Sequence, residues 1–365
     1  MKRMGRYWVS LLMGLSVGMA EGAIAQTVAP VPPKSFRDWC TQQKTWEKET
    51  QDTVALLLAI AGTSDCEKAD QELTGMTSMM LANSGIADLR PLESLPNLEV
   101  LLLNSNRIQN ISPLQSLTKL RILTLDTNQI SDISPLSSLT NLRVLTLDTN
   151  QITDLSPLQP LTQLTNLLLY SNQISDLSPL ATLTNLRALS LYQNRIADLS
   201  PLASLTALEA LSLYQNQITD LRPLASLTNL RILALFSNQI SDITPIGTLA
   251  NLETLTLFEN KITDLTPLSR LSSLNELIIG NNPIADLKPL ARLKNLQKLA
   301  LFNTPVADVS PLKNSVQLTN LDLYNTRVTS VEALKNLANL RELDLRKTPL
   351  QKKACPVQPA SVCRF

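Results

Sequence analysis

The chain has 365 residues, with 32 Lys and Arg against 31 Asp and Glu, and it contains no histidine. A net charge of +1 provides no basic surface of the kind that nucleic-acid binding requires, so we expect no nucleic-acid partner. The lack of histidine removes the commonest general base and the commonest metal ligand. The sequence also has no glycine-rich phosphate loop, and we predict no catalytic residue, no metal and no cofactor.

The N-terminus has the pattern of a signal peptide. Lys2, Arg3 and Arg6 precede an apolar run at 8–20, and the small residues at 23–25 ("AIA") form a cleavage signal. The run is shorter than the roughly 20 residues that a membrane-crossing helix needs, so we expect no transmembrane segment. We predict an exported protein that is located in the periplasm, the cell envelope or the extracellular space.

Residues 26–72 are expected to form a linker and a helical cap. The stretch that ends in "VALLLAIAG" predicts one helix that becomes buried toward its C-terminus and ends at Gly62, with a short second helix after position 64 or 65. We interpret Trp39 and Trp46 as packing residues of this cap rather than as ligand contacts.

Residues 73–350 repeat with a period of 22 residues, in thirteen units of which the last is truncated. The unit at 139–160 reads "LTNLRVLTLDTNQITDLSPLQP", and its alternating "VLTL" predicts a strand. One asparagine recurs per unit from Asn106 to Asn282, and threonine replaces it in the last three units. We expect the asparagine to bond to the backbone of its turn, which is a structural role.

The "DLSPL" segment predicts the side of the repeat opposite the strand. We expect Ser156 to be a helix N-cap, with Pro157 at the first helical position and a short 3₁₀ segment after it. The recurring aspartate, Asp154 in this unit, is interpreted as turn chemistry. Calcium binding is the alternative, although the glycine-rich pattern of calcium-binding rolls is missing.

The pattern LxxLxLxxNxI, together with "DLSPL", resembles the 22-residue leucine-rich repeats of internalin-like and SDS22-like proteins, of the secreted bacterial type. The resemblance implies an α/β solenoid: a horseshoe with a parallel concave β-sheet, short 3₁₀ segments on the convex side and a helical N-terminal cap. It says little about the ligand, because this fold hosts many functions.

The four cysteines lie at the two ends of the repeats. Because an exported chain meets oxidising conditions, we expect disulfides, and we favour the local pairs Cys40–Cys66 and Cys355–Cys363. Their spacing does not match a zinc site. Residues 351–365 are expected to form a C-terminal disulfide cap that folds over the last strand.

One column of the repeat collects most of the aromatic residues. The chain has five Tyr and five Phe, and seven of these ten residues occupy the position just after the "LxL" of the strand. The column from the fifth to the twelfth unit is the predicted partner-binding site: Tyr170, Tyr192, Tyr214, Phe236, Phe258, Gly280, Phe302 and Tyr324. We call its seven rings the aromatic stripe.

Two interpretations of the aromatic stripe remain open. The rings can stack on one another and stabilise the sheet, or they can form an apolar surface that binds a partner. Only the second interpretation explains why the first four units need no rings, so we favour it. Gly280 is expected either to leave a notch about 10 Å wide between its neighbouring rings or to meet a backbone requirement.

The function that we predict is binding of a protein partner through the aromatic stripe. Glycan binding or a structural role in the cell envelope is the alternative, and phosphatase regulation of the SDS22 type is a weaker one. Two pairs of aspartates in adjacent units, Asp126 with Asp148 and Asp322 with Asp344, have the separation of a glycosidase pair. We expect them to lie on an open, wet surface, where nothing raises a pKa.

Overall fold

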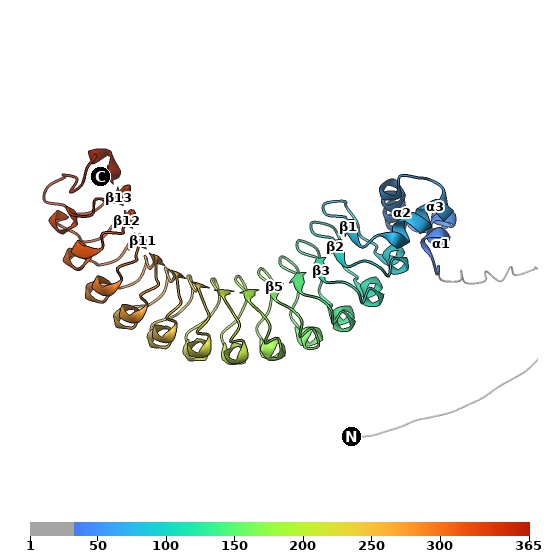
Figure 1. Cartoon of the computed structure of the whole chain (residues 1–365), viewed down its shortest axis with the longest axis horizontal. Helices are drawn as coiled ribbons and strands as arrows, with labels where there is room; N and C mark the ends of the chain where they lie inside the picture. Colours follow the sequence, from blue (N-terminus) through green and yellow to red (C-terminus); the bar gives the residue numbers. More distant parts are fainter. Residues whose placement is uncertain (1–32) are drawn as a thin grey trace, which may run out of the picture. The chain divides into compact units, whose positions relative to one another are not determined.

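The structure, a computed structural model, describes residues 33–365. The predicted signal peptide, 1–25, lies outside the described residues. Residues 34–365 form one compact unit. Within this unit the repeats stack side by side along a curve, with the strands on the inner side and the 3₁₀ helices on the outer side (Figure 1).

Every strand in the described part of the chain is short, and all fourteen found there belong to one parallel sheet in which the strand order follows the chain from β1 to β14. The strands are β1 (Ser78–Met80), β2 (Val100–Leu102), β3 (Ile122–Thr124), β4 (Val144–Thr146), β5 (Asn166–Leu168), β6 (Ala188–Ser190), β7 (Ala210–Ser212), β8 (Ile232–Ala234), β9 (Thr254–Thr256), β10 (Glu276–Ile278), β11 (Lys298–Ala300), β12 (Asn320–Asp322), β13 (Glu342–Asp344) and β14 (Cys363–Arg364). Leu189 pairs with Leu211 in the next strand, so the register advances by one 22-residue unit per strand. The predicted concave sheet is confirmed.

A 3₁₀ helix lies on the convex side of each of the twelve complete repeats, as the sequence predicts. These helices are η2 (Arg90–Ser94), η3 (Ser112–Ser116), η4 (Ser134–Ser138), η5 (Ser156–Leu158), η6 (Ser178–Thr182), η7 (Ser200–Ser204), η8 (Arg222–Ser226), η9 (Thr244–Thr248), η10 (Thr266–Arg270), η11 (Lys288–Arg292), η12 (Ser310–Asn314) and η13 (Glu332–Leu334). Leucines from strand and convex side meet in one continuous core; Leu145, Leu147 and Leu158, for example, are fully buried. Neighbouring units share this core, which is why such repeats fold together rather than alone.

The start of each 3₁₀ helix differs from our expectation. Ser156 is the first residue of η5 and caps nothing with its side chain. Instead Asp154 Oδ1 accepts a hydrogen bond of 2.8 Å from the Ser156 backbone N–H. The N-cap role assigned to Ser156 is wrong, because the aspartate two residues earlier closes the turn, and the turn role predicted for that aspartate is confirmed.

The repeated asparagine joins adjacent units. Asn216 Nδ2 donates to the carbonyl oxygens of Leu213 and Leu191, both at 3.0 Å, and its Oδ1 accepts from the Ile196 backbone N–H. Because Leu191 and Ile196 belong to the preceding unit, the side chain replaces ladder bonds that a turn cannot make. The structural role predicted for this column is confirmed.

The N-terminal cap is α-helical but is not one long helix. It contains α1 (Phe36–Thr41), a 3₁₀ turn η1 (Gln43–Thr45), α2 (Lys48–Ala61) and α3 (Cys66–Gly75). The expected single helix is broken between α1 and α2. Gly62 ends α2 with a φ of 67°, as predicted, because this left-handed conformation suits glycine.

Packing and polar contacts hold the cap on the first repeat. The rings of Trp39 and Trp46 lie 4.8 Å apart between centroids, and Trp39 is buried, which confirms their packing role. Thr50 Oγ1 donates to Asp88 Oδ2 at 2.5 Å, and Arg90 forms ion pairs with Asp88 and with Glu47 of the cap. The cap therefore covers the exposed core at this end of the solenoid.

Both predicted disulfides are present, Cys40–Cys66 in the N-terminal cap and Cys355–Cys363 at the other end. At the C-terminus a last 3₁₀ helix, η14 (Ala360–Val362), leads into β14, which pairs with β13. The C-terminal segment thus covers the last repeat by adding a strand to its sheet. Within residues 33–365 no helix has both the length and the apolar character that crossing a membrane requires.

Candidate functional site

The concave face is a regular grid of side chains. In each strand the middle residue is buried and its two neighbours point outward. In β7, for example, Leu211 is buried and Ala210 and Ser212 point outward. The aromatic stripe is the third outward column, since Tyr214 follows two residues after Ser212 on the same face. All seven rings are half-buried.

Five consecutive rings form one parallel stack. The centroids of Tyr170, Tyr192, Tyr214, Phe236 and Phe258 are separated by 4.1, 4.0, 4.0 and 4.2 Å in order, with interplanar angles of 9–13°. Such pairs stabilise a fold by about 0.5–1.5 kcal/mol each beyond their burial. The stacking that we considered as one interpretation is therefore present.

The stack also decides which ring surfaces a partner can reach. Each inner ring has a neighbouring ring on both of its faces, so only its outer edge is free. The stripe therefore presents a ridge of aromatic edges and tyrosine hydroxyls, not a series of open ring faces. A sugar that stacks on an aromatic ring needs an open face, and the stack leaves none on Tyr192, Tyr214 or Phe236.

The notch that we expected at Gly280 does not exist. The rings of Phe258 and Phe302 approach to 6.0 Å at a tilt of 53°, instead of the 10 Å that we expected. A Cβ atom placed on Gly280 would lie 2.6 Å from carbons of the Phe302 ring. Phe302 thus lies across the glycine and fills the gap, and since the φ of Gly280 is not positive, space for this ring explains the glycine.

Charged residues end the stripe beyond Phe302. The Cζ atom of Arg346 lies 5.5 Å from the centroid of the Tyr324 ring, and Lys347 Nζ lies 5.1 Å from it. Both distances fit cation–π contacts. Tyr324 is therefore covered by cations rather than by a further ring, and nothing in the sequence pattern had indicated these contacts.

At its other end the stripe meets a buried carboxyl group. Asp148 is 3% exposed, and burial raises its pKa to about 6 although hydrogen bonding from the Tyr170 hydroxyl lowers it. Asp126 Oδ1, one unit earlier, accepts from Thr146 Oγ1 at 2.7 Å. The open, wet surface that we expected for this pair is wrong for Asp148, because Tyr170 lies against it.

The hydroxyl groups of the three tyrosines form a hydrogen-bonded chain that ends at this carboxyl group. The hydrogen bond to Asp148 raises the pKa of Tyr170, and burial raises the pKa values of Tyr192 and Tyr214. Tyr214 donates to Tyr192, Tyr192 to Tyr170, and Tyr170 to Asp148. The hydroxyl hydrogens are therefore used within the stripe, and the hydroxyl oxygens meet a partner as hydrogen-bond acceptors.

A shelf of small side chains lies beside the ridge. Ser190, Ser212 and Ala234 are the outward residues two positions before Tyr192, Tyr214 and Phe236. One large apolar residue, Ile232, lies on the far side of the shelf, two positions before Ala234, and is 47% exposed. Ridge and shelf together form a continuous surface on which the side chains of a partner can lie.

The turn after each ring is held in a left-handed conformation that sequence reasoning missed. The residue that follows the aromatic column has a φ of 52–60° in all thirteen units, including Gln193, Gln215 and Glu259. The signal was available, because this column contains no apolar residue: eleven of its thirteen residues are Asn, Ser, Thr or Gln, and the other two are Glu259 and Lys347. Side-chain hydrogen bonds also link residues of this column in neighbouring units. Asn303 Nδ2, for example, donates to Asn281 Oδ1 at 2.7 Å.

The second aspartate pair, Asp322 with Asp344, lines a pocket of about 200 Å³ on the concave face of β10–β13. Asp344 is 7% exposed and pairs with Arg346, and burial raises the pKa of Asp322. The open, wet surface that we expected is wrong for Asp344, which is buried beside Arg346, whereas Asp322 is half-buried in the pocket.

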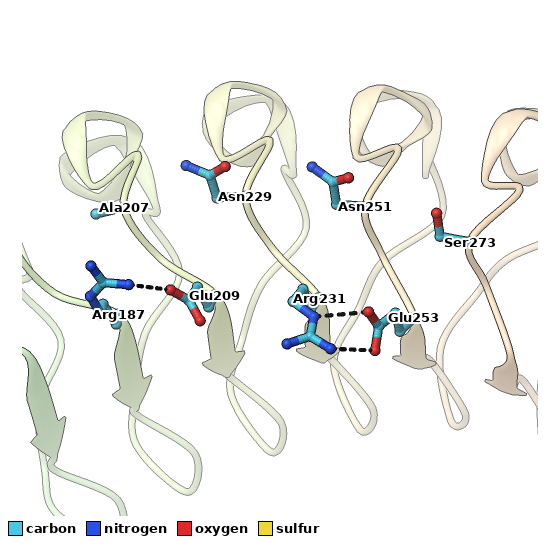
Figure 2. Close-up of a pocket in the computed structure, with 8 residues that line it drawn as sticks. All are labelled: Arg187, Ala207, Glu209, Asn229, Arg231, Asn251, Glu253 and Ser273. Atoms are coloured by element: carbon cyan, nitrogen blue, oxygen red, sulfur yellow. Dashed lines mark hydrogen bonds and ion pairs between the residues drawn. The ribbon is translucent and has the colours of Figure 1, made fainter.

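An open groove of about 460 Å³ crosses the N-terminal ends of the neighbouring strands β6–β10. Figure 2 shows its two rows: the charged residues Arg187, Glu209, Arg231 and Glu253 near the strands, and Ala207, Asn229, Asn251 and Ser273 nearer the convex turns. Nothing in our sequence analysis had marked this surface.

The recurring aspartates are engaged in their turns. The side chain and backbone of Ser134 lower the pKa of Asp132, and Ser156 does the same for Asp154. Within residues 33–365 no three residues of the metal-binding types gather around a common point.

The family model for leucine-rich repeats (two copies per match) fits residues 96–138, 118–160, 162–204, 206–248, 228–270, 250–292 and 272–314. The chain belongs to the leucine-rich repeat family. A search of curated proteins finds no significant match.

Among solved structures, this leucine-rich repeat protein is similar to an internalin, InlF, from Listeria monocytogenes. The two share 38% identity with a TM-score of 0.82, over 86% of this chain and 94% of that one. A leucine-rich repeat protein from Leptospira interrogans matches with 27% identity and a TM-score of 0.66, over 73% of this chain and 77% of that one. The protein is thus internalin-like, as its repeats indicate.

A plant membrane receptor kinase ectodomain from Arabidopsis thaliana also matches, with 21% identity and a TM-score of 0.61, over 77% of this chain and 40% of that one. This likeness shows the fold alone.

Proposed function

We propose that this leucine-rich repeat protein is an exported binding module that recognises a protein partner through the aromatic stripe on its concave face. The observation that carries the proposal is the stack of five rings from Tyr170 to Phe258, which presents aromatic edges and hydroxyls beside a shelf of small residues. Aromatic residues with a polar rim are typical of the centre of a protein interface.

Two features favour a protein partner over a glycan. The faces of the inner rings are covered by their neighbours, so a sugar finds no open ring face on Tyr192, Tyr214 or Phe236. The ridge, the shelf and the exposed Ile232 instead form an extended surface that crosses several strands, which suits the contact area of a protein.

Export is part of the proposal. The signal-peptide pattern at 1–25 supports it, and so do the two disulfides, which persist in oxidising compartments. We place the protein in the periplasm, the cell envelope or the extracellular space, with an interaction role rather than an enzymatic one. Export also argues against an SDS22-like role as a phosphatase regulator.

The test replaces three rings of the stripe at once. The variant Tyr192→Ala, Tyr214→Ala, Phe236→Ala should fail to capture the protein that the wild type retains from a cell-surface extract, while its far-UV circular dichroism stays unchanged. A matched control replaces three exposed glutamines, Gln151, Gln217 and Gln239, with alanine and should capture normally.

If the triple variant still captured the protein, the binding proposal would be wrong, and the only role left for the rings would be to stabilise the sheet. A glycan array probed with the same two proteins tests the alternative. Glycan binding by the wild type that the triple variant loses would show that the ligand is a glycan and not a protein.

A further inference from the structure

The flank of the solenoid where the strands begin carries a separate, ordered set of charges. The residue just before each of β2 to β13 forms one row along this flank: Glu99, Arg121, Arg143, Thr165, Arg187, Glu209, Arg231, Glu253, Asn275, Gln297, Thr319 and Arg341. We call these twelve residues the flank row. Its central four residues line the groove of Figure 2.

The central charges alternate in sign and remain accessible. Arg187 pairs with Glu209 at 2.6 Å, and Arg231 pairs with Glu253 at 2.8 Å. The side chains are still 66%, 43%, 57% and 36% exposed in that order. Exposed pairs of this kind contribute little to the stability of their own chain, so these groups are free to meet a second set of charges.

The flank row is complementary to itself when its direction is reversed. The row is centred between β7 and β8, which is also the middle of the fourteen-strand sheet. In a second copy laid antiparallel on this flank, Arg231 lies opposite Glu209, Glu253 opposite Arg187, and Arg341 opposite Glu99. The remaining positions pair Arg121 with Thr319, Arg143 with Gln297 and Thr165 with Asn275, so no like charges meet.

We propose that this flank is a homodimer interface in which two copies of the chain associate antiparallel about a two-fold axis between β7 and β8. A two-fold axis requires one patch to be complementary to itself. Six of the eight charged residues of the flank row meet an opposite charge, and the other two, Arg121 and Arg143, meet neutral residues. Charge complementarity of this kind sets orientation and excludes wrong partners.

The second row of the groove suits the same contact. Ala207, Asn229, Asn251 and Ser273 carry no charge that would repel a partner. Asn229 and Asn251 use Nδ2 to donate to the carbonyl oxygens of Thr206 and Thr228, which leaves each Oδ1 as an acceptor. The groove therefore has space and acceptors for the arginine side chains of the other copy.

The dimer leaves the proposed binding site open. Because the axis lies in the plane between the flanks, both concave faces point to the same side, and each aromatic stripe stays uncovered. A dimer would thus present two equivalent sites to one surface, which raises avidity without new contacts. The association does not depend on the proposed function, since no stripe residue takes part.

Sedimentation equilibrium of the purified full chain tests this interface. The wild type should dimerise at low salt and dissociate as salt rises, because the Debye length falls from about 10 Å at 0.1 M to about 3 Å at 1 M. Arg231→Glu and Glu209→Arg should each weaken dimerisation by at least ~10-fold, because each places like charges opposite each other twice. Arg195→Glu, the same charge change on the opposite flank, should have no effect.

A mixture of the two charge-reversed variants provides the decisive test of the interface. In a heterodimer of Arg231→Glu with Glu209→Arg, opposite charges meet again at both central contacts, so the equimolar mixture should recover the wild-type dissociation constant. A wild type that stays monomeric up to ~1 mM, a single variant that dimerises normally, or a mixture that stays as weak as its components would each overturn the proposal.

Discussion

Asp148 shows how one ring changes the state of a neighbouring residue. Its carboxyl group is buried against Tyr170 at the end of the aromatic stripe, and burial raises its pKa to about 6. An aspartate in the unfolded chain titrates near 3.9. The folded state therefore binds more protons than the unfolded state between these two values, and Asp148 contributes most stability below about pH 4 and loses that contribution as the pH rises through 6.

The variant Asp148→Asn tests this burial. The amide stays neutral, and its oxygen can still accept from Tyr170, so the variant should be more stable than the wild type at pH 7. The difference in the free energy of unfolding should shrink as the pH falls toward 5, by up to about 1.4 kcal/mol per pH unit. Urea denaturation at several pH values measures it, and a difference that stays constant between pH 5 and 7 would show that Asp148 is not buried as an ionised group.

Sequence reasoning could place Asp148 in its column but could not predict its burial. The 22-residue period fixes which residues share a face, because every unit has the same backbone. Burial depends on which way the Tyr170 ring turns, and a single repeat pattern does not contain that information. The role of Gly280 could not be predicted for the same reason, since only the ring orientation of Phe302 shows that the glycine makes room for a side chain.

At the scale of the repeat, the asparagine ladder is the element that joins units, and it stops before the C-terminus. Asn282 still bonds to the carbonyl oxygen of Leu257 in the preceding unit. Thr304, Thr326 and Thr348 instead donate only within their own units, to Leu301, Leu323 and Leu345 respectively. The last three units therefore lack the asparagine ladder, although other side-chain bonds such as that from Asn339 Nδ2 to the Val316 carbonyl oxygen still cross between them.

Hydrogen exchange should reveal this difference. In a stack of repeats stability is the sum of intrinsic terms and nearest-neighbour contacts, so the units with fewer contacts open first. We expect the backbone amides of β11–β13 to exchange faster than those of β6–β8, as measured by mass spectrometry of peptides from the folded protein. Equal protection along the sheet would mean that β14 and its disulfide replace the missing ladder in full.

The elements that the sequence predicted correctly are those that recur from unit to unit. Strands, convex 3₁₀ turns and the asparagine ladder all follow from apolar spacing and from turn residues. The break between α1 and α2 was missed, because the cap occurs once and no second copy supports its pattern. The N-cap assigned to Ser156 was wrong for a different reason: two polar residues compete for one turn, and Asp154 makes the bond.

For the whole molecule, the solenoid separates three surfaces that can act independently. The concave face carries the aromatic stripe, the flank carries the alternating charges of the flank row, and the convex side carries the aspartate turns. The sequence predicted the stripe because aromatic residues are rare elsewhere in the chain. It did not reveal the flank row, since alternating charges gain meaning only when the strands place them side by side.

The most direct test of the stripe as a binding site asks which surface the captured protein touches. Replacing Tyr214 with the photoreactive aromatic residue p-benzoylphenylalanine puts a cross-linker within the ring stack, and the same residue at Ser200 puts one on the convex side. The captured protein should cross-link on irradiation from position 214 and not from position 200. Cross-linking from position 200 and none from position 214 would contradict the concave site and place the partner on the convex surface.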